Sequence, residues 1–309
     1  MDTSSHSERA GERSVTVEQG NAGSGAAASR GADLRGQLRG MWAAVAPAWA
    51  AHADYADARG ASMSARMLEV SAPRAGERVL ELACGPGGLG LAAAERVGPS
   101  GEVVLSDLVA EMTAIAAARA RARGLGNVRT RELDLERIDQ PDRAFDVVLC
   151  REGLMFAPDP ARAVREIARV LRPGGRAALA VWGPPRRNPW LAVVFQAVSA
   201  ELGESVPPPG VPGPFALDDG DRLAALLRAA GLVDVAVAEV ATPMHAASVD
   251  DWWQRTSSLA GPLALRLRLL PEARAAALRQ RVEQAVAGYR VPDGLAFPGL
   301  SLIASGRRS

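Results

Sequence analysis

Apolar residues in the middle of the chain form short continuous runs that alternate with longer stretches of helical period. Strands are expected at 78–82, 102–106, 127–133, 145–150 and 176–182, and helices at 89–97, 109–123 and 160–171. Strands that are apolar on both faces are typical of a parallel sheet with helices on each side. With right-handed crossovers, this order predicts a doubly wound, mostly parallel α/β sheet, which we expect to have seven strands.

Helical patterns lie on both sides of this alternation. Apolar residues recur at helical spacing over 34–45, and Pro47 is expected to break that helix. Farther along, the pattern predicts helices at 190–202, 217–230 and about 249–289, with strands at 233–240 and 299–305. We therefore expect a helical cap over 33–72, a core over 73–182, and late helical insertions that form a lid within 183–309.

Composition and charge narrow the class of protein. Residues 1–32 are rich in Ser, Gly, Ala, Glu and Arg, so we expect a disordered tail before one domain over 33–309. The formal net charge of +1, without a basic stripe, argues against a nucleic-acid partner. No apolar run could span a bilayer and no secretory signal is visible, which favours a cytoplasmic protein without a membrane partner. Cys84 and Cys150 provide no metal cluster, so no metal is expected.

A glycine-rich turn follows the first strand and leads into a helix, as in nucleotide-binding sites. Glycines such as Gly85 and Gly87 let the backbone approach a ligand closely. The acid Glu81 at the strand end would repel a phosphate but suits a cationic ligand. Asp107 ends the next strand, where a carboxylate can accept both hydroxyls of a ribose, and Asp134 follows the third strand. This pattern predicts a site for a positively charged nucleoside without phosphate.

These residues resemble the class I S-adenosylmethionine (SAM)-dependent methyltransferases, a Rossmann-like family, and particularly the branch of ubiquinone/menaquinone biosynthesis. The first motif of that family is an acid followed by Gly-x-Gly-x-Gly. The segment 81–87, Glu-Leu-Ala-Cys-Gly-Pro-Gly, matches it except that Ala83 replaces the first glycine. Further similarity lies in 105–108 with Met112, in 133–135, in 145–150 and in 163–175. The resemblance covers residues 40–182 well, and it implies SAM as cofactor and S-adenosylhomocysteine as product.

The resemblance also implies roles for individual residues. Gly85 and Gly87 would pass under the methionine part of SAM, and Glu81 would order that loop. Asp107 would hold the ribose, with Leu108 packing on adenine, and Asp134 would accept from the adenine amino group. The remaining residues implied as cofactor contacts are Trp49, Ala83, Cys84, Met112, Leu135, Cys150 and Arg151.

Three residues are candidates for catalysis if the methyl acceptor holds a proton that must be removed. His52 lies in the helical cap, and His245 lies between the late strand and the insertion. The alternative for both is an ordinary, partly exposed histidine. Glu152 follows the fourth strand, and its alternative is a helix cap or a pair with an arginine.

We expect the activity to be methyl transfer from SAM to a hydrophobic small molecule, a specialised metabolite or a quinone-like ring. The acceptor would contact an apolar pocket from the cap and the late insertions; its members would be Trp42, Trp49, Tyr55, Met63, Met67, Phe195, Phe215, Trp252 and Trp253. Two alternatives are a SAM-binding protein that catalyses another step, such as a cyclisation, and a non-catalytic binding module. A homodimer is left open.

Overall fold

The computed structural model describes residues 22–209 and 211–309, together with Met1. Its main sheet has seven strands in the order β3-β2-β1-β4-β5-β10-β6. The strands are β1 (Arg78–Leu82), β2 (Glu102–Asp107), β3 (Val128–Glu132), β4 (Phe145–Arg151), β5 (Leu171–Trp182), β6 (Leu232–Ala241) and β10 (Leu300–Arg308). Strand β10 is antiparallel to both neighbours, and the pairs from β3 to β5 are parallel. The expected mostly parallel, seven-stranded, Rossmann-like sheet is therefore confirmed.

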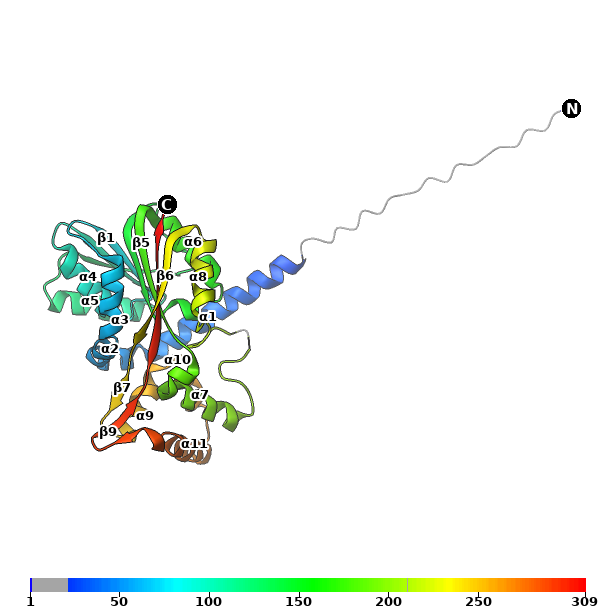
Figure 1. Cartoon of the computed structure of the whole chain (residues 1–309). Helices are drawn as coiled ribbons and strands as arrows, with labels where there is room; N and C mark the ends of the chain where they lie inside the picture. The colour runs from blue at the N-terminus through cyan, green and yellow to red at the C-terminus, as the bar shows by residue number, and fades with distance from the viewer. Residues whose placement is uncertain (2–21, 210) are drawn as a thin grey trace.

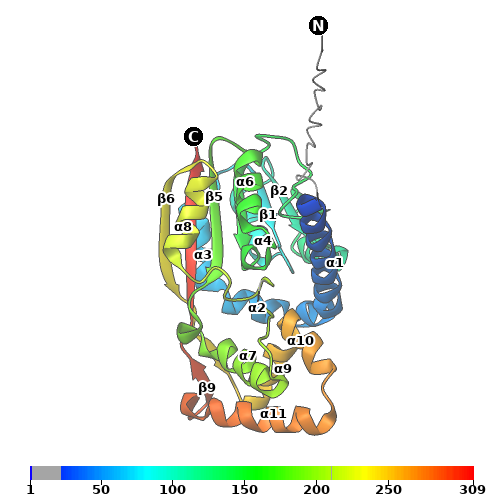
Figure 2. The same ribbon diagram turned by 90° about the vertical axis from the view of Figure 1, so that its right-hand side faces the viewer.

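Helices cover both faces of this sheet (Figures 1 and 2). One face packs on α3 (Ala61–Ser71), α4 (Gly88–Val97) and α5 (Ala110–Ala122); the other packs on α6 (Pro160–Val170) and α8 (Gly220–Ala229). Successive strand residues serve opposite faces, so Val79 belongs to the first layer and Leu80 to the second. Helix α6 begins where the side chain of Asp159 accepts a hydrogen bond from the Arg162 amide, 2.9 Å away.

The N-terminal cap consists of α1 (Ala22–Ala51), α2 (Ala53–Arg59) and α3. Two expectations are wrong here. Helix α1 begins at Ala22, ahead of the predicted end of the tail at residue 32, while residues 2–21 lie outside the described part. Pro47 does not break α1 but lies inside it, on its exposed side. Pro47 lacks the backbone N–H donor that a helix normally uses. The buried side chains of Val45 and Ala46 pack against their neighbours and keep the helix continuous at this point.

The late helices form a layer beyond one end of the main sheet (Figure 2). They are α7 (Pro189–Leu202), α9 (Val249–Leu259), α10 (Gly261–Arg268) and α11 (Glu272–Ala285). The expected long helix over 249–289 is therefore several helices. A second sheet, which the sequence pattern did not predict, pairs β7 (Met244–Ala246), β9 (Gly294–Phe297) and β8 (Arg290–Val291). We call this layer, residues 183–299 without α8 and β6, the lid; its core contains Trp252 and Phe297.

Short 3-10 turns join several of these elements, at Leu154–Phe156, Pro185–Arg187 and Ala287–Tyr289. Within the described residues, no helix combines the length and the apolar character that a membrane crossing would need.

Candidate functional site

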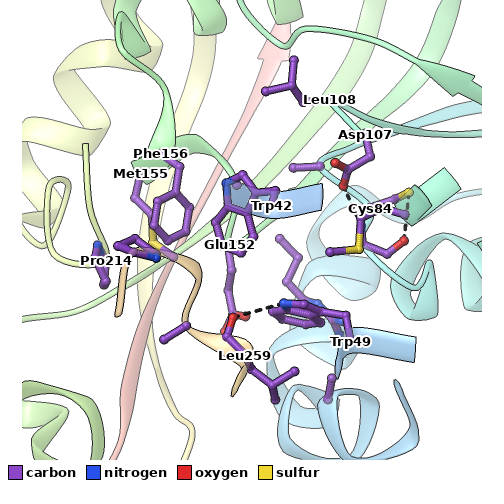
Figure 3. A pocket seen from close by; sticks show the side chains of 18 of the residues that line it. Trp42, Trp49, Cys84, Asp107, Leu108, Glu152, Met155, Phe156, Pro214 and Leu259 are labelled. Atoms are coloured by element: carbon purple, nitrogen blue, oxygen red, sulfur yellow. Dashed lines mark hydrogen bonds between the residues drawn. The ribbon is translucent and has the colours of Figure 1, made fainter. Parts of the chain in front are cut away.

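A cavity with about 1480 Å³ of empty space, its open mouth included, lies where the carboxyl ends of the parallel strands meet the cap and the lid. In a doubly wound sheet, ligands bind outside these strand ends. Of the residues expected to touch a cofactor or take part in catalysis, these line it: Trp49, Ala83, Cys84, Gly85, Asp107, Leu108, Met112, Asp134, Leu135, Arg151 and Glu152. Figure 3 shows Asp107 and Cys84 on one side of this space and Met155 and Phe156 on the other, with Trp42 between them.

The turn after β1 is tightly wound. Ala83, Gly85 and Gly87 all have positive φ, at 50°, 51° and 85°. A Cβ added to Gly85 would meet no atom within 4 Å, so this part of the turn borders open space. Gly87 lies deeper and does not line the cavity; a Cβ there would come within 3.0 Å of Leu105 and Ala116. The turn therefore presents its backbone to the cavity at Gly85, while Gly87 permits close packing on the helix behind.

Asp107 ends β2 and faces the cavity beside this turn. Its carboxylate accepts hydrogen bonds from the Gly85 amide at 2.9 Å and from the Val109 amide at 3.2 Å. Burial raises the pKa of Asp107 to about 6, although these backbone amides act in the opposite direction. Each carboxylate oxygen keeps a second lone pair, so the group can still accept hydrogen bonds from a ligand hydroxyl.

Asp134 lines the cavity as expected, but it already faces a cation that the sequence did not reveal. Arg35 of α1 approaches it, with Nε 3.2 Å from the carboxylate, and also pairs with the buried carboxylate of Glu136. The second oxygen of Asp134 accepts from the Glu136 amide at 2.8 Å. Helix α1 is thereby attached to the loop after β3, and it covers this end of the cavity.

Glu81 lies behind the turn and does not line the cavity. It is buried, and it accepts a hydrogen bond from the Gly90 amide in the first turn of α4 at 2.8 Å. Burial raises the pKa of Glu81 to about 8, against the opposing effects of Arg151 and of that amide. The carboxyl group thus connects β1 to the start of α4 and orders the turn from behind, so direct ligand contact is not its role in this arrangement.

The two cysteines are free, buried thiols on neighbouring strand ends. Cys84 lines the cavity, whereas Cys150 is covered by its neighbours. Burial raises the pKa of Cys150 to about 12 and the pKa of Cys84 well above its usual value. Neither thiol is therefore activated as a nucleophile.

Glu152 lines the cavity but is engaged in a nearly buried ion pair. Arg59 of α2 donates to both of its carboxylate oxygens, at 3.1 and 2.7 Å, and Trp182 donates its indole N–H at 2.5 Å. Burial alone would raise the pKa of Glu152, but Arg59 and the other donors outweigh it and hold the pKa below its usual value. The guanidinium of Arg59 also lies over the rings of Trp182 and Trp190. The structure therefore shows Glu152 paired with an arginine, which was the alternative to a catalytic role.

The two histidines expected to take part in catalysis do not line the cavity. His52 lies at the start of α2 and does not line the cavity. His245 is exposed on β7, because Met244 and Ala246 on either side of it point into the lid core. The alternation of a strand therefore directs His245 outward.

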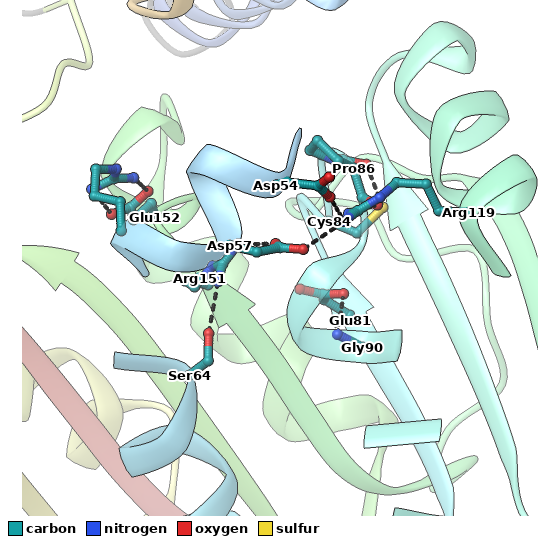
Figure 4. Close-up of polar contacts among 12 residues, drawn as sticks. Asp54, Asp57, Ser64, Glu81, Cys84, Pro86, Gly90, Arg119, Arg151 and Glu152 are labelled. Atoms are coloured by element: carbon teal, nitrogen blue, oxygen red, sulfur yellow. Dashed lines mark hydrogen bonds and ion pairs between the residues drawn. The ribbon is translucent and has the colours of Figure 1, made fainter. Parts of the chain in front are cut away.

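An ion-pair cluster clamps α2 onto the glycine turn (Figure 4). Asp57 pairs with Arg119 of α5 at 2.6 Å and lies 3.7 Å from Arg151. Arg119 in turn donates to the carbonyl of Pro86 in the turn, at 2.9 Å. Asp57 is packed so closely that a Cβ on Gly88 would come within 1.7 Å of its carboxylate. Sequence reasoning missed this cluster, because charges far apart along a chain carry no local signal of pairing.

The wall opposite the strand ends is mostly apolar. The expected pocket residues Trp42, Trp49 and Tyr55 line it, whereas the other expected members are packed in the sheet or lid layers. Trp42 meets Phe156 edge to face, with ring centroids 5.0 Å apart. The indole N–H of Trp49 donates to the carbonyl of Leu259 at 3.1 Å and so joins the cap to the lid. Cap, lid and strand ends therefore enclose one continuous space.

Comparison with known proteins agrees with this geometry. Residues 79–175 match the family model described as a methyltransferase domain. The ubiquinone/menaquinone biosynthesis C-methyltransferase UbiE of Ectopseudomonas mendocina (strain ymp) is 40% identical over 133 residues, which are 43% of this chain and 52% of that protein. The chain thus spans about half the length of the curated relatives that it matches.

Solved structures share the fold. The YcgJ protein of Bacillus subtilis has a TM-score of 0.55 at 21% identity, over 79% of this chain and 97% of that one. The [4+2]-cyclase SpnF has a TM-score of 0.50 at 22% identity, over 80% of each chain. The matched segment is thus similar to a methyltransferase domain, and the solved structures share its fold. The resemblance found in the sequence is confirmed, with the matched domain at residues 79–175.

Proposed function

We propose that this protein transfers a methyl group from SAM to a hydrophobic small molecule. One observation carries the proposal: a single cavity is bounded by the glycine turn and strand-end acids on one side and by an apolar aromatic wall on the other. The first side suits a nucleoside and the second an apolar acceptor. Their common space would bring the two reactants together.

The residues of the first side fit SAM in kind and placement. The backbone of Gly85 borders open space, and Asp107 beside it has lone pairs for the ribose hydroxyls. Leu108 and Met112 supply an apolar surface for adenine, and the carboxylate of Asp134 could accept from the adenine amino group. The further contacts proposed are Trp49, Ala83, Cys84, Leu135 and Arg151, with Glu81, Gly87 and Cys150 supporting the turn from behind.

The sulfonium of SAM supplies an electrophilic methyl carbon, which an acceptor atom would attack in line with the departing sulfur. The protein would contribute orientation and exclusion of water, which in well-oriented systems supply roughly 7–11 kcal/mol of barrier lowering. Its cap and lid enclose the cavity through Trp49 and Leu259. No histidine lines the cavity in the described part of the chain, so an acceptor atom that is nucleophilic at neutral pH fits this site best.

The curated relative named above is a ubiquinone/menaquinone biosynthesis C-methyltransferase, which makes a quinol-like ring our preferred acceptor class. The cyclase alternative stays open for a specific reason. SpnF, a [4+2]-cyclase, shares this fold at a similar level to YcgJ. The fold thus accommodates more than one reaction, and an assay of the reaction itself is needed to distinguish methyl transfer from cyclisation.

The test is transfer of a labelled methyl group. The full chain is incubated with methyl-labelled SAM and a reduced naphthoquinone as a model ring, with Asp107→Ala as the matched variant. We expect label in the organic extract with the wild-type protein and little with Asp107→Ala. A second assay offers small molecules extracted from a bacterial lysate as acceptors. If the protein binds SAM but transfers label neither to the reduced naphthoquinone nor to these molecules, a cyclase or a binding module is favoured instead.

A further inference from the structure

Three shielded polar atoms of cavity-lining residues have no hydrogen-bond partner within the described part of the chain. One, Nε of Arg35, still lies 3.2 Å from the carboxylate of Asp134. The other two are neighbours in α9: Oγ1 of Thr256 and Nε of Arg255. Thr256 as a whole is 4% exposed. Buried polar atoms are almost always paired in folded proteins, so two neighbouring exceptions at a cavity need an explanation.

Helical geometry places both residues on the face of α9 that borders the cavity. The residues of α9 and its C-terminal end that line the cavity are Arg255, Thr256, Leu259 and Ala260, a spacing of one and four positions that forms one stripe. Trp252, one turn earlier on the same face of α9, is buried in the lid core. The unpartnered atoms thus lie where this face leaves the lid core and borders the cavity.

The hydroxyl of Thr256 differs from its neighbours. Ser257 and Ser258 donate to backbone carbonyls three residues earlier, at 3.3 and 3.1 Å, as helical hydroxyls usually do. Thr256 makes no such bond. Its hydroxyl is therefore free to bind a ligand.

The guanidinium of Arg255 is fixed in place, but one of its donors is unused. It lies over the ring of Tyr55, 4.1 Å from the ring centroid, and one terminal nitrogen pairs with Asp251. The hydroxyl of Tyr55 contacts only the weakly accepting sulfur of Met244 in the described structure, at 3.5 Å. The guanidinium of Arg255 and the ring of Tyr55 thus lie side by side in the cavity wall.

We propose that Thr256 and Arg255 form a binding site for an oxygen of the methyl acceptor. The acceptor would then be an apolar molecule that bears a carboxylate or a ring hydroxyl, because a charged N–H donor and a hydroxyl both favour such an oxygen. The oxygen would satisfy the two buried donors, and the surrounding Leu259 and Ala260 would contact the apolar part. This inference rests on the proposed function only in calling the ligand an acceptor.

The site can be tested by binding, without turnover. Trp42, Trp49, Trp182 and Trp190 line the cavity, so quenching of tryptophan fluorescence reports occupancy. The probes are 2-naphthoate, 2-naphthol and 2-methylnaphthalene, which differ at one substituent. We expect at least one oxygen-bearing probe to bind the wild-type protein roughly 10-fold more tightly than 2-methylnaphthalene. Thr256→Val keeps the shape of the side chain and should reduce this preference severalfold, without changing 2-methylnaphthalene binding.

Ser257→Ala is the matched control, since it removes a hydroxyl that already has a partner; it should keep the preference. If the affinity rises most for 2-naphthoate, relative to 2-methylnaphthalene, the oxygen of the acceptor is assigned to a carboxylate. If it rises for 2-naphthol alone, the oxygen is assigned to a ring hydroxyl. Equal binding of all three probes to the wild-type protein, or a preference unchanged by Thr256→Val, would overturn the inference. Calorimetry with S-adenosylhomocysteine separates the two proposals: Thr256→Val should bind it normally, and failure of the wild-type protein to bind it would count against the proposed function alone.

Discussion

The methyl group of Ala83 lies against the backbone of Gly153, so closely that a Cβ on Gly153 would come within 2.4 Å of the Ala83 Cβ and 2.9 Å of the Cys150 sulfur. Ala83 is the residue that departs from the glycine of the family motif, and it has a φ of 50°. This left-handed conformation costs a residue with a side chain roughly 1–2 kcal/mol. The missing side chain at Gly153 makes room for the extra methyl group in the turn.

Gly153→Ala should therefore destabilise the protein by about 2 kcal/mol, because the new methyl group collides with Ala83 and Cys150. Ala83→Gly in the same chain should recover part of this loss. Urea unfolding of the two single variants and the double variant gives the coupling between the positions. Gly126→Ala is the control, since a Cβ there meets no atom within 4 Å. Strictly additive effects of the two substitutions would contradict the packing described.

Glu81 should make stability depend on pH. Its folded pKa of about 8 lies above the ordinary value of 4.5, so between these values the folded state keeps a proton that the unfolded state has released. The contribution of Glu81 to the free energy of unfolding must then fall as pH rises from 4.5 to 8. Below pH 4.5 this contribution does not change with pH, because the group is protonated in both states. The free energy of unfolding, measured at pH 5 and pH 8, should drop less for Glu81→Gln than for the wild-type protein. An identical pH dependence of both proteins would refute the burial argument.

The Arg59–Glu152 pair should behave as a structural clamp and not as a base. Glu152→Gln leaves the nearly buried guanidinium of Arg59 without its carboxylate, at a cost of roughly 3 kcal/mol. Arg59→Met combined with Glu152→Gln should cost less than Glu152→Gln alone. Thermal unfolding checks both statements. Complete loss of methyl transfer in Glu152→Gln, with the melting temperature unchanged, would instead restore Glu152 as a candidate base.

The contact between Asp57 and the glycine turn should control the position of α2. Gly88→Ala would displace the Asp57 carboxylate and break its 2.6 Å pair with Arg119. We expect faster amide hydrogen exchange in 53–59 and about 10-fold weaker binding of S-adenosylhomocysteine. Gly36→Ala in α1, where a Cβ meets no atom within 4 Å, should change neither. Unchanged exchange in α2 would show that the cap does not depend on this contact.

The alternation of apolar runs predicted central strands such as β1 and β4 because they are short, continuous and buried on both faces. It predicted neither the three-stranded sheet of the lid nor the division of the late helical stretch, since those elements are short and their pairing is not local. Pro47 shows the other limit. A local breaker was overridden by packing on both sides of it, which no window of sequence contains.

The strand-end side of the cavity was largely foreseeable, because strand ends and a glycine turn are fixed by local sequence. The residues that the structure added lie on the cap and lid: Arg35, Asp57, Arg59, Arg255 and Thr256. They meet the core through contacts between residues far apart along the chain. The histidines were favoured for their chemistry alone, and the strand alternation that turns His245 outward spans only β7. The roles of individual site residues, the homodimer and the cytoplasmic location stay predictions.

The most direct test of the account is calorimetric titration of the full chain with S-adenosylhomocysteine. We predict saturable binding to one site, and at least 10-fold weaker binding by Asp107→Ala, whose carboxylate both holds the Gly85 amide and faces the cavity. Circular dichroism should show that this variant remains folded. Absence of binding by the wild-type protein, or equal affinity of the folded Asp107→Ala variant, would contradict the central claim that these strand ends hold SAM.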